Sequence, residues 1–494
     1  MRAPCLIGWA QVARHPGEPL DAWAEALTAT GVDPARVDSL DVVHCMSWPY
    51  DDPPGRLAER VGAAPRRRAS SGIGGTTPLQ LVAAAAERIA AGAADVCAVV
   101  GGEALDTVRR LRRAGERPAW SHRDPVRRPF PFEGPLPDGE VAHGLLQAYS
   151  TFALRDVARR ARRGEDVAEH RASLGELFAP MTKVAAANPY AWFPVERTAA
   201  ELTAVGPGNR MVAFPYTMRL VAVMDVDLAG AVVLASAEAA DRLGVPADRR
   251  VHLRGWGWAT DPVAVAEHDD LWRSPGLAAA ARQALAGAGL GVDDVAHMDL
   301  YSCFPSSVSF ALDALGLAAD DSRAPFTLTG GLPYAGGAGS AYVLSSLAAA
   351  ADRLVADPGA AGLVTGVGMH MTKHAAAVLS TTPGTVEPPS RDPGPAVRRP
   401  VAGAQHGPAR LAAYTVHHDR AGVATDAVAV CDVGTAAGED GGEAGGPRTA
   451  RCYAVARDPH LLAVLEAEEW VGRAVALVDG GAGTNLIAGP SGSS

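Results

Sequence analysis

The segment SSGIGGTTPLQLVAAAAERIA, residues 70–90, joins a glycine-rich turn directly to an apolar run. Thr77 suits a helix N-cap, Pro78 the first helical position and Gln80 the third position of a capping box, so a helix is predicted to begin here. Residues 79–86 are apolar on every side, which indicates burial inside a large protein. Such a helix directs unpaired N–H groups and the positive end of its dipole into the turn.

This unit occurs twice in the chain. After the first helix, AADVCAVVGGE at 93–103 predicts a buried strand that ends in glycines. A second small-residue turn, TGGLPYAGGAGS at 329–340, precedes a second alanine-rich helix at 341–354 and a second apolar strand at 360–369. Two copies predict a duplicated α/β architecture with two central helices packed against each other. The alternative is that alanine-rich helices only reflect a GC-rich coding style.

Composition restricts the class of protein. The 494 residues are enough for about three domains, and the net charge of -10 argues against a nucleic-acid binder by charge alone. The N-terminus does not have the pattern of a signal peptide, and no stretch is long and apolar enough to span a membrane. The cysteines form no CxxC pair, so we expect reduced thiols, no metal site and a cytoplasmic protein. They are Cys5, Cys45, Cys97, Cys303, Cys431 and Cys452.

Changes in composition along the chain predict its domains. Residues 1–112 alternate apolar strands with helices, which is typical of a mostly parallel α/β unit. Short strands separated by turns dominate the C-terminal part, where a small β-barrel or sandwich and a mobile acidic loop at 434–447 are expected. The predicted parts are a first α/β half at 1–240 with an insertion at about 113–214, a second half at 241–385, a linker at 386–403 and a β domain at 404–494.

The insertion at about 113–214 and the helix before it are dense in arginine. Such runs usually form solvated helix faces. An arginine-rich insertion beside two glycine turns is also where a phosphate-bearing ligand would be held. The sequence does not decide between a solvated helix face and a phosphate-binding site.

Cys303 and His374 are the candidate reactive side chains. Cys303 follows a predicted strand and precedes Pro305, which can begin a helix. A thiol at a helix N-terminus is expected to have a lowered pKa and to act as a nucleophile or proton shuttle, whereas the alternative is inert packing. His374 follows the second glycine-ended strand, next to Lys373, and is a candidate general base, with His370 the second choice. The alternative for either histidine is a surface or packing role.

Residues 89–96, IAAGAADV, and 101–103, GGE, resemble the segment that follows the nucleophilic cysteine in the thiolase superfamily. An ungapped count back from this segment places Gly75 at the cysteine position. The resemblance therefore implies that the usual nucleophile is missing and that acylation at this position is excluded.

Three further motifs support the resemblance and show where it departs. YSCF at 301–304 is similar to the HDCF motif of sterol-carrier-protein thiolases, in which the cysteine is a catalytic acid/base; Tyr301 and Ser302 differ from the motif. Gly337 falls at the histidine of the GHP motif, and the last glycine loop, 365–368, has no cysteine. The chain as a whole is similar to thiolase-like proteins of type 1, which carry an additional OB-like C-terminal domain.

The resemblance implies a duplicated five-layer αβαβα fold, an inserted loop domain and a small C-terminal β domain. It also implies an acyltransferase or related carbon–carbon bond enzyme, of lipid or polyketide metabolism, that acts on acyl-CoA or carrier-protein thioesters and has no tightly bound cofactor. We expect Cys303 and His374 to be catalytic, by direct attack on a bound thioester or with Cys303 as an atypical nucleophile. The predicted ligand contacts are Gly75, Thr76, Tyr301, Gly337, Gly366 and Gly368.

Two other functions stay open. The first is a non-catalytic acyl-CoA-binding protein or complex subunit that keeps the fold without the chemistry. The second is binding of a partner or nucleic acid through the C-terminal domain, although its acidic loop and few aromatic residues argue against single-stranded nucleic acid. The chain is expected to be a monomer or a homodimer.

Overall fold

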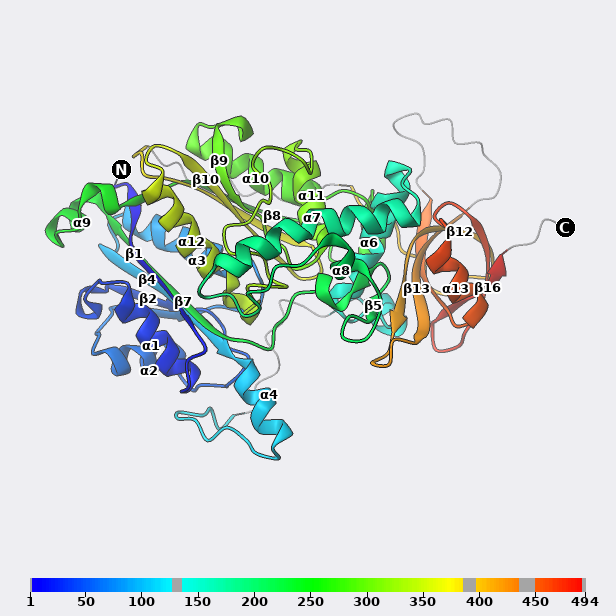
Figure 1. The fold of residues 1–494 in the computed structure, drawn as a ribbon, viewed down its shortest axis with the longest axis horizontal. Helices are drawn as coiled ribbons and strands as arrows, with labels where there is room; N and C mark the ends of the chain where they lie inside the picture. The colour runs from blue at the N-terminus through cyan, green and yellow to red at the C-terminus, as the bar shows by residue number, and fades with distance from the viewer. Residues whose placement is uncertain (1, 127–135, 385–396, 435–448, 491–494) are drawn as a thin grey trace.

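The computed structural model describes residues 2–126, 136–384, 397–434 and 449–490. Nine strands are connected in one order, β3-β2-β4-β7-β1-β8-β11-β10-β9, and a second sheet of seven strands lies toward the C-terminus. In Figure 1 the nine strands form two halves with helices between them and on both outer sides. The chain therefore has the expected five-layer α/β architecture.

The first half of the large sheet has the order β3-β2-β4-β7-β1. β2 and β4 run parallel to each other, whereas β7 is antiparallel to both β4 and β1. The mostly parallel arrangement predicted for residues 1–112 is confirmed, because β3, β2 and β4 run parallel to one another. The long strand β7, which comes later in the chain, lies between β4 and β1 in the opposite direction. The strands are β1 (Pro4–Ala13), β2 (Ser39–Val42), β3 (Arg67–Ser70), β4 (Val96–Ala104) and β7 (Asp227–Ser236).

The second half has the order β8-β11-β10-β9 and joins the first where β1 pairs with β8 through two residue pairs. β10 is parallel to β9 and antiparallel to β11, so this half is also mixed. Its strands are β8 (Val251–Thr260), β9 (Val295–Asp299), β10 (Ala361–Gly368) and β11 (Lys373–Ser380).

The two repeated helices, α3 (Thr77–Ala90) and α12 (Tyr342–Ala356), pack between the halves and contact strands of both. In Figure 1 they lie in the middle layer, with α1 and α2 on one outer side and α10 and α11 on the other. The outer helices are α1 (Pro19–Ala29), α2 (Pro53–Val61), α9 (Ala237–Arg242), α10 (Pro275–Ala288) and α11 (Pro305–Leu315).

The start of α3 differs in detail from the prediction. Thr76, not Thr77, is the N-cap residue, and its side chain makes no capping hydrogen bond. The Thr77 hydroxyl donates instead to the carbonyl oxygen of Gly74 at 2.8 Å, which tightens the glycine turn. The predicted capping box is therefore absent because the threonine side chain is used within the turn.

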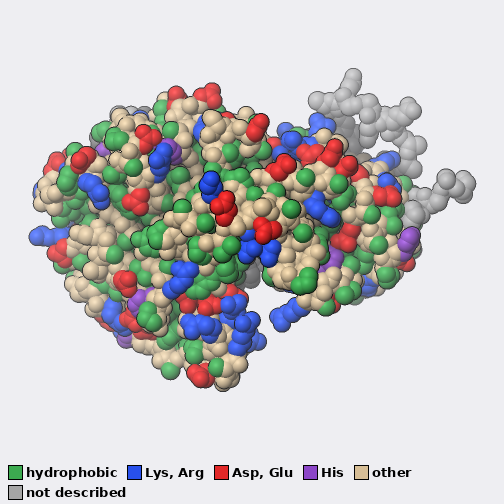
Figure 2. Space-filling view, viewed as in Figure 1, with side chains coloured by type: hydrophobic (Ala, Val, Ile, Leu, Met, Phe, Trp, Pro, Cys, Tyr) green, Lys and Arg blue, Asp and Glu red, His purple; other side chains and the backbone are tan. Residues whose placement is uncertain are grey.

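After β4, the helix α4 (Leu105–Arg113) leaves the sheet, and basic side chains gather over it beside a hollow in the surface (Figure 2). The insertion that follows contains α5 (Asp138–Ala142), α6 (Ala148–Arg163), α7 (Val167–Ala187) and α8 (Ala199–Thr203). It ends with two short strands, β5 (Met211–Ala213) and β6 (Tyr216–Thr217). No helix of the described ranges is long and apolar enough to cross a membrane.

The C-terminal strands close into a barrel, because β12 pairs with both β13 and β15. The order β12-β13-β14-β16-β15 is that of a small five-stranded barrel, and β5 of the insertion extends its sheet by pairing with β12. Its elements are β12 (Gly407–His418), β13 (Ala424–Val433), β14 (Ala450–Ala456), α13 (Pro459–Ala467), β15 (Ala474–Asp479) and β16 (Asn485–Pro490). Most of the expected linker at 386–403, and all but the first residue of the expected mobile loop at 434–447, lie outside the described residues.

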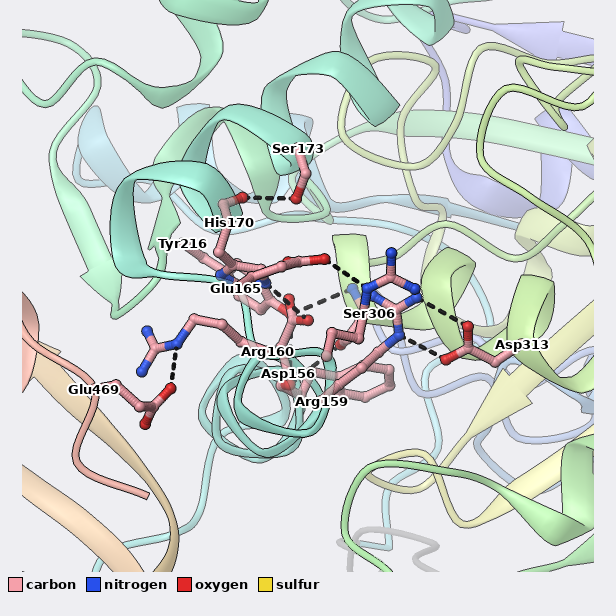
Figure 3. Close-up of polar contacts among 12 residues, drawn as sticks. Asp156, Arg159, Arg160, Glu165, His170, Ser173, Tyr216, Ser306, Asp313 and Glu469 are labelled. Atoms are coloured by element: carbon pink, nitrogen blue, oxygen red, sulfur yellow. Dashed lines mark hydrogen bonds and ion pairs between the residues drawn. The ribbon is translucent and has the colours of Figure 1, made fainter. Parts of the chain in front are cut away.

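Helix α6 connects the α/β core to the barrel through a buried polar cluster (Figure 3). Asp156 lies 3.3 Å from Nε2 of His170 on α7 and accepts a hydrogen bond from the Tyr216 hydroxyl at 2.7 Å. The same hydroxyl accepts the N–H of Ser306 at the start of α11.

Arg159 and Arg160 extend this cluster in two directions. Arg159 pairs with Asp313 on α11 at 2.6 and 2.9 Å. Arg160 pairs with Glu469 of the C-terminal part at 2.9 Å and donates to the hydroxyl of Tyr414 on β12 at 3.0 Å. These insertion arginines therefore have a structural role.

Replacement of Asp156 by asparagine is expected to destabilise the fold. Burial acts to raise the pKa of Asp156, but His170, the Tyr216 hydroxyl and the charge of Arg159 together outweigh it and lower the pKa. A lowered carboxyl pKa gives stability that is present above the unfolded value of about 3.9 and is lost as pH falls through the folded value. At pH 7, Asp156→Asn should lower the free energy of unfolding by about 3 kcal/mol in urea titrations followed by circular dichroism.

The same variant should lose less stability than the unmodified chain between pH 5 and acid. The control is Asp320→Asn, since Asp320 is exposed and its replacement should change little. Equal stability of the Asp156 and Asp320 variants at pH 7 would show that the cluster does not hold the fold.

Candidate functional site

The two glycine turns meet beside the end of strand β10 in the large sheet. The N–H of Gly74, just before α3, donates to Oγ of Ser340 at 3.0 Å, and Ser340 lies just before α12. The end of β10 reaches the same place, because a Cβ atom on Gly366 would lie 2.8 Å from the carbonyl oxygen of Gly75. The starts of both central helices and the end of β10 therefore form one site.

Gly75 has no space for a side chain. A Cβ atom there would lie 2.2 Å from the carbonyl oxygen of Val367 and 2.5 Å from the hydroxyl oxygen of Tyr301. Real Cβ contacts are essentially never so short, and the first neighbour is backbone that cannot turn aside. The place of the expected nucleophile is therefore filled by Tyr301 and Val367.

Two backbone N–H groups at the start of α3 have no hydrogen-bond partner among the residues that the structure describes. Within the described ranges, neither the N–H of Gly75 nor that of Thr76 has a hydrogen-bond partner. Both precede α3, where unpaired N–H groups and the helix dipole favour negative charge. Gly368 lies beside them, since its Cβ atom would be 3.5 Å from the nitrogen of Gly75. The structure thus brings together Gly75, Thr76, Tyr301, Gly366 and Gly368, whose roles stay predictions.

Tyr301 is fixed by neighbours from three parts of the chain. Its N–H donates to Oγ1 of Thr365 on β10 at 2.8 Å. Its ring packs edge-on against Tyr342 at the start of α12, with 5.8 Å between centroids. Burial, and then the nearby Cys303, raise the pKa of its hydroxyl. Tyr301 is therefore a neutral phenol at physiological pH and can donate a hydrogen bond.

The thiol of Cys303 differs from its prediction. Cys303 does lie just before α11, and the Ser307 hydroxyl and nearby backbone N–H groups act to lower its pKa. Burial is the larger effect and raises the pKa of Cys303 to about 12. The expected lowered pKa is wrong because the thiol is 7% exposed and has no cationic neighbour among the causes of its shift.

His374 contacts a helix cap. Its Nε2 atom lies 3.0 Å from Oδ2 of Asp261 and 3.0 Å from Oγ of Ser274, the N-cap residue of α10. Burial acts to raise the pKa of Asp261, but His374, together with the charges of Arg155 and His268, outweighs it and holds that pKa far below its usual range. Among the described residues, Nδ1 of His374 has no partner. His374 is thus paired with Asp261 and Ser274, and its role as a base stays a prediction.

The loop after β10 is strained, which sequence patterns do not reveal. Met369, His370 and Met371 have φ values of 43°, 54° and 62°, in the left-handed region that non-glycine residues rarely adopt. Helix α6 holds this loop: Thr151 contacts Nδ1 of His370 at 3.3 Å, and Arg155 donates to the carbonyl of Met371 at 3.2 Å. Strain held in this way is typical of functional sites.

Gly337 lies in the second turn with other neighbours. Its N–H donates to the carbonyl oxygen of Val223 at 2.8 Å, and a Cβ atom would lie 3.2 Å from Leu332. A histidine there would therefore need Leu332 to move. In the part of the chain that the structure describes, no three His, Cys, Asp or Glu side chains are grouped to hold a metal ion.

Replacing Gly75 by cysteine should damage the fold without supplying a usable nucleophile. Gly75→Cys forces a Cβ atom against Val367 and Tyr301, so we expect a loss of about 2–3 kcal/mol in the free energy of unfolding. The matched control is Gly368→Ala, whose Cβ atom meets its neighbours at an ordinary 3.5 Å. A Gly75→Cys protein as stable as the control variant would contradict the packing described above.

The native Cys303 thiol should be slow to alkylate. With a pKa of about 12, only a very small fraction of the thiol is ionised near pH 7.5. Iodoacetamide labelling followed by peptide mass spectrometry should find Cys303 no more reactive than the other buried cysteines. Fast, selective labelling of Cys303 would show that the thiol is activated in solution.

Comparisons with known proteins support the fold. A scan against protein-family models and a search of curated proteins both find no match. Among solved structures, a monomeric SCP2-thiolase like protein type 1 from Mycobacterium smegmatis matches with a TM-score of 0.83 and 29% identity, over 98% of this chain and 98% of that chain.

A second structure, the Ltp2-ChsH2(DUF35) aldolase, matches with a TM-score of 0.57 and 21% identity, over 77% of this chain and 98% of that chain. At this identity the second match shows the fold alone. The resemblance read from the motifs is confirmed: this chain has the thiolase fold, and over nearly its whole length it is similar to an SCP2-thiolase-like protein of type 1.

Proposed function

We propose that this protein binds a thioester of CoA or of a carrier protein in a thiolase-like site and does not form an acyl-enzyme. The observation that carries this proposal is the filled space at Gly75, where the Tyr301 hydroxyl and the Val367 carbonyl leave no room for a nucleophilic side chain. The geometry thus excludes a nucleophile at residue 75, so a thioester bound here is not transferred to the protein at that position.

The donors at the site suit a thioester carbonyl. The N–H groups of Gly75 and Thr76 lie at the start of α3, and the phenol of Tyr301 stays neutral because burial raises its pKa. Preorganised donors of this kind hold a carbonyl oxygen and stabilise negative charge that develops on it. A ligand carbonyl here would make polar contacts without covalent attack.

Exposed arginines on and after α4, a helix that begins next to the second glycine turn, suit the phosphates of CoA. A Cβ atom on Gly339, in the second turn, would lie 2.8 Å from Oε1 of Glu103 on β4, and α4 begins two residues after Glu103. Arg112, Arg113 and Arg117 on and after α4 are exposed, and within the described ranges they form no ion pair. Arginine binds phosphate through paired, charge-assisted hydrogen bonds.

A second candidate is acyl transfer, or carbon–carbon bond chemistry, by direct attack on the bound thioester. The position of Cys303 favours it, because this thiol lies two residues after Tyr301 in the chain and carries a proton that it can donate to a ligand. In that case Cys303→Ala should lower turnover by roughly two to four orders of magnitude. Under the first proposal no turnover is found and Cys303→Ala leaves CoA binding unchanged.

Calorimetry with CoA, at low and at high salt, tests the binding. Affinity should fall as salt rises, and the double variant Arg112→Ala, Arg113→Ala should bind roughly tenfold more weakly. The matched control is Arg282→Ala, an exposed arginine on α10. Intact-mass spectrometry after incubation with acetyl-CoA should show no adduct. No CoA binding at low salt, or a stable acyl adduct, would overturn the proposal.

A further inference from the structure

Two cysteines of the C-terminal barrel face each other. Cys431 on β13 and Cys452 on β14 are direct partners in the antiparallel register of these strands. Both side chains are 0% exposed and belong to the hydrophobic core of the barrel. Twenty residues separate them in the sequence, so no short motif marks the pair.

Their placement suits a disulfide. Directly opposed residues of an antiparallel pair have Cα atoms about 4.5–5.5 Å apart, and disulfides need about 4.4–6.8 Å. The other strand cysteines lack such a partner: Cys5 lies opposite Ala235 and His252, and Cys97 lies opposite Leu234 and Ser39. Among the strand pairs that the structure describes, this is the pair in which two thiols meet.

The two thiols also differ in their pKa values. The interaction between the two adjacent thiols lowers the pKa of Cys452 and, together with burial, raises the pKa of Cys431. Cys452 is therefore the sulfur that ionises first and attacks an oxidant, and Cys431 keeps its proton until the second step.

We propose that Cys431 and Cys452 are a peroxide-sensitive dithiol, which hydrogen peroxide converts to an intramolecular disulfide when local opening of β13 and β14 exposes the two buried thiols. The Cys452 thiolate attacks one peroxide oxygen, the O–O bond breaks, and the departing hydroxide takes up a proton to give water. Cys431 sulfur then attacks the sulfenic sulfur of Cys452, the S–O bond breaks, and the hydroxyl leaves with the Cys431 proton as a second water. Two thiols lose two electrons, and one peroxide becomes two waters.

The disulfide would join two strands of the barrel that contacts α6. β13 pairs with β12, and Tyr414 on β12 accepts the hydrogen bond of Arg160. A covalent bridge limits local opening of these strands, so the oxidised chain should show slower amide exchange in β13 and β14. The inference depends on the barrel alone and is independent of ligand binding at the glycine turns.

The experiment treats the full chain with graded hydrogen peroxide, then alkylates it in denaturant and maps the peptides. The count of free thiols should fall from six to four, with a peptide linking Cys431 to Cys452 that dithiothreitol releases. Cys431→Ala and Cys452→Ala should abolish the bridge, whereas Cys97→Ala, which removes an equally buried but unpaired thiol, should keep it.

Peptide mapping of the unmodified chain tests the proposal even if a cysteine variant folds poorly. Free Cys431 and Cys452 after peroxide treatment, sulfinic acid on Cys452 beside a free Cys431, or bridges only between separate chains would each overturn the proposal.

Discussion

The close approach of backbone at Gly75 is the constraint on which the site depends. Val367 on β10 places its carbonyl oxygen 2.2 Å from the point where a Cβ atom would lie, and Tyr301 fills the remaining space. This contact joins the start of α3 in one half of the fold to β10 in the other. The residues that form the site therefore also pack the two halves together. A side chain at residue 75 would require the Val367 backbone or Tyr301 to shift, whereas a ligand carbonyl needs only the N–H groups already present.

Helix α6 supports this arrangement from outside the core. Through Thr151 and Arg155 it holds the left-handed loop after β10, and through Arg160 it reaches Tyr414 and Glu469 of the barrel. The Arg155 side chain is fully buried, and burial lowers its pKa to about 10. Burial of an arginine is costly unless its hydrogen bonds are satisfied, and carbonyls of Leu271, Met371 and Arg273 satisfy it here. Helix α6 of the insertion therefore connects the barrel to the site and holds the loop after β10 in place.

The repeated turn, helix and strand made the fold predictable from the sequence. Much of the site was not predictable, because it depends on burial and on contacts between distant residues. The turn, helix and strand at 70–103 and their copy at 329–369 follow local rules, and they lie where those rules predict. The raised pKa of Cys303 was not predictable, because it depends on burial that outweighs the helix terminus. The pairing of His374 with Asp261 and Ser274 joins residues 100 or more positions apart, and no local pattern reports it. The antiparallel position of β7 between β4 and β1 likewise joins distant parts of the chain, and no local pattern reports it.

The most direct test of the account is a crystal structure of the chain with acetyl-CoA bound. We predict an intact thioester whose carbonyl oxygen accepts hydrogen bonds from the N–H groups of Gly75 and Thr76, with Tyr301 beside it and the adenosine phosphates toward α4. An acetyl group attached covalently to any side chain, or a bound ligand that avoids the glycine turns, would contradict the central claim that this thiolase-like site binds thioesters without forming an acyl-enzyme.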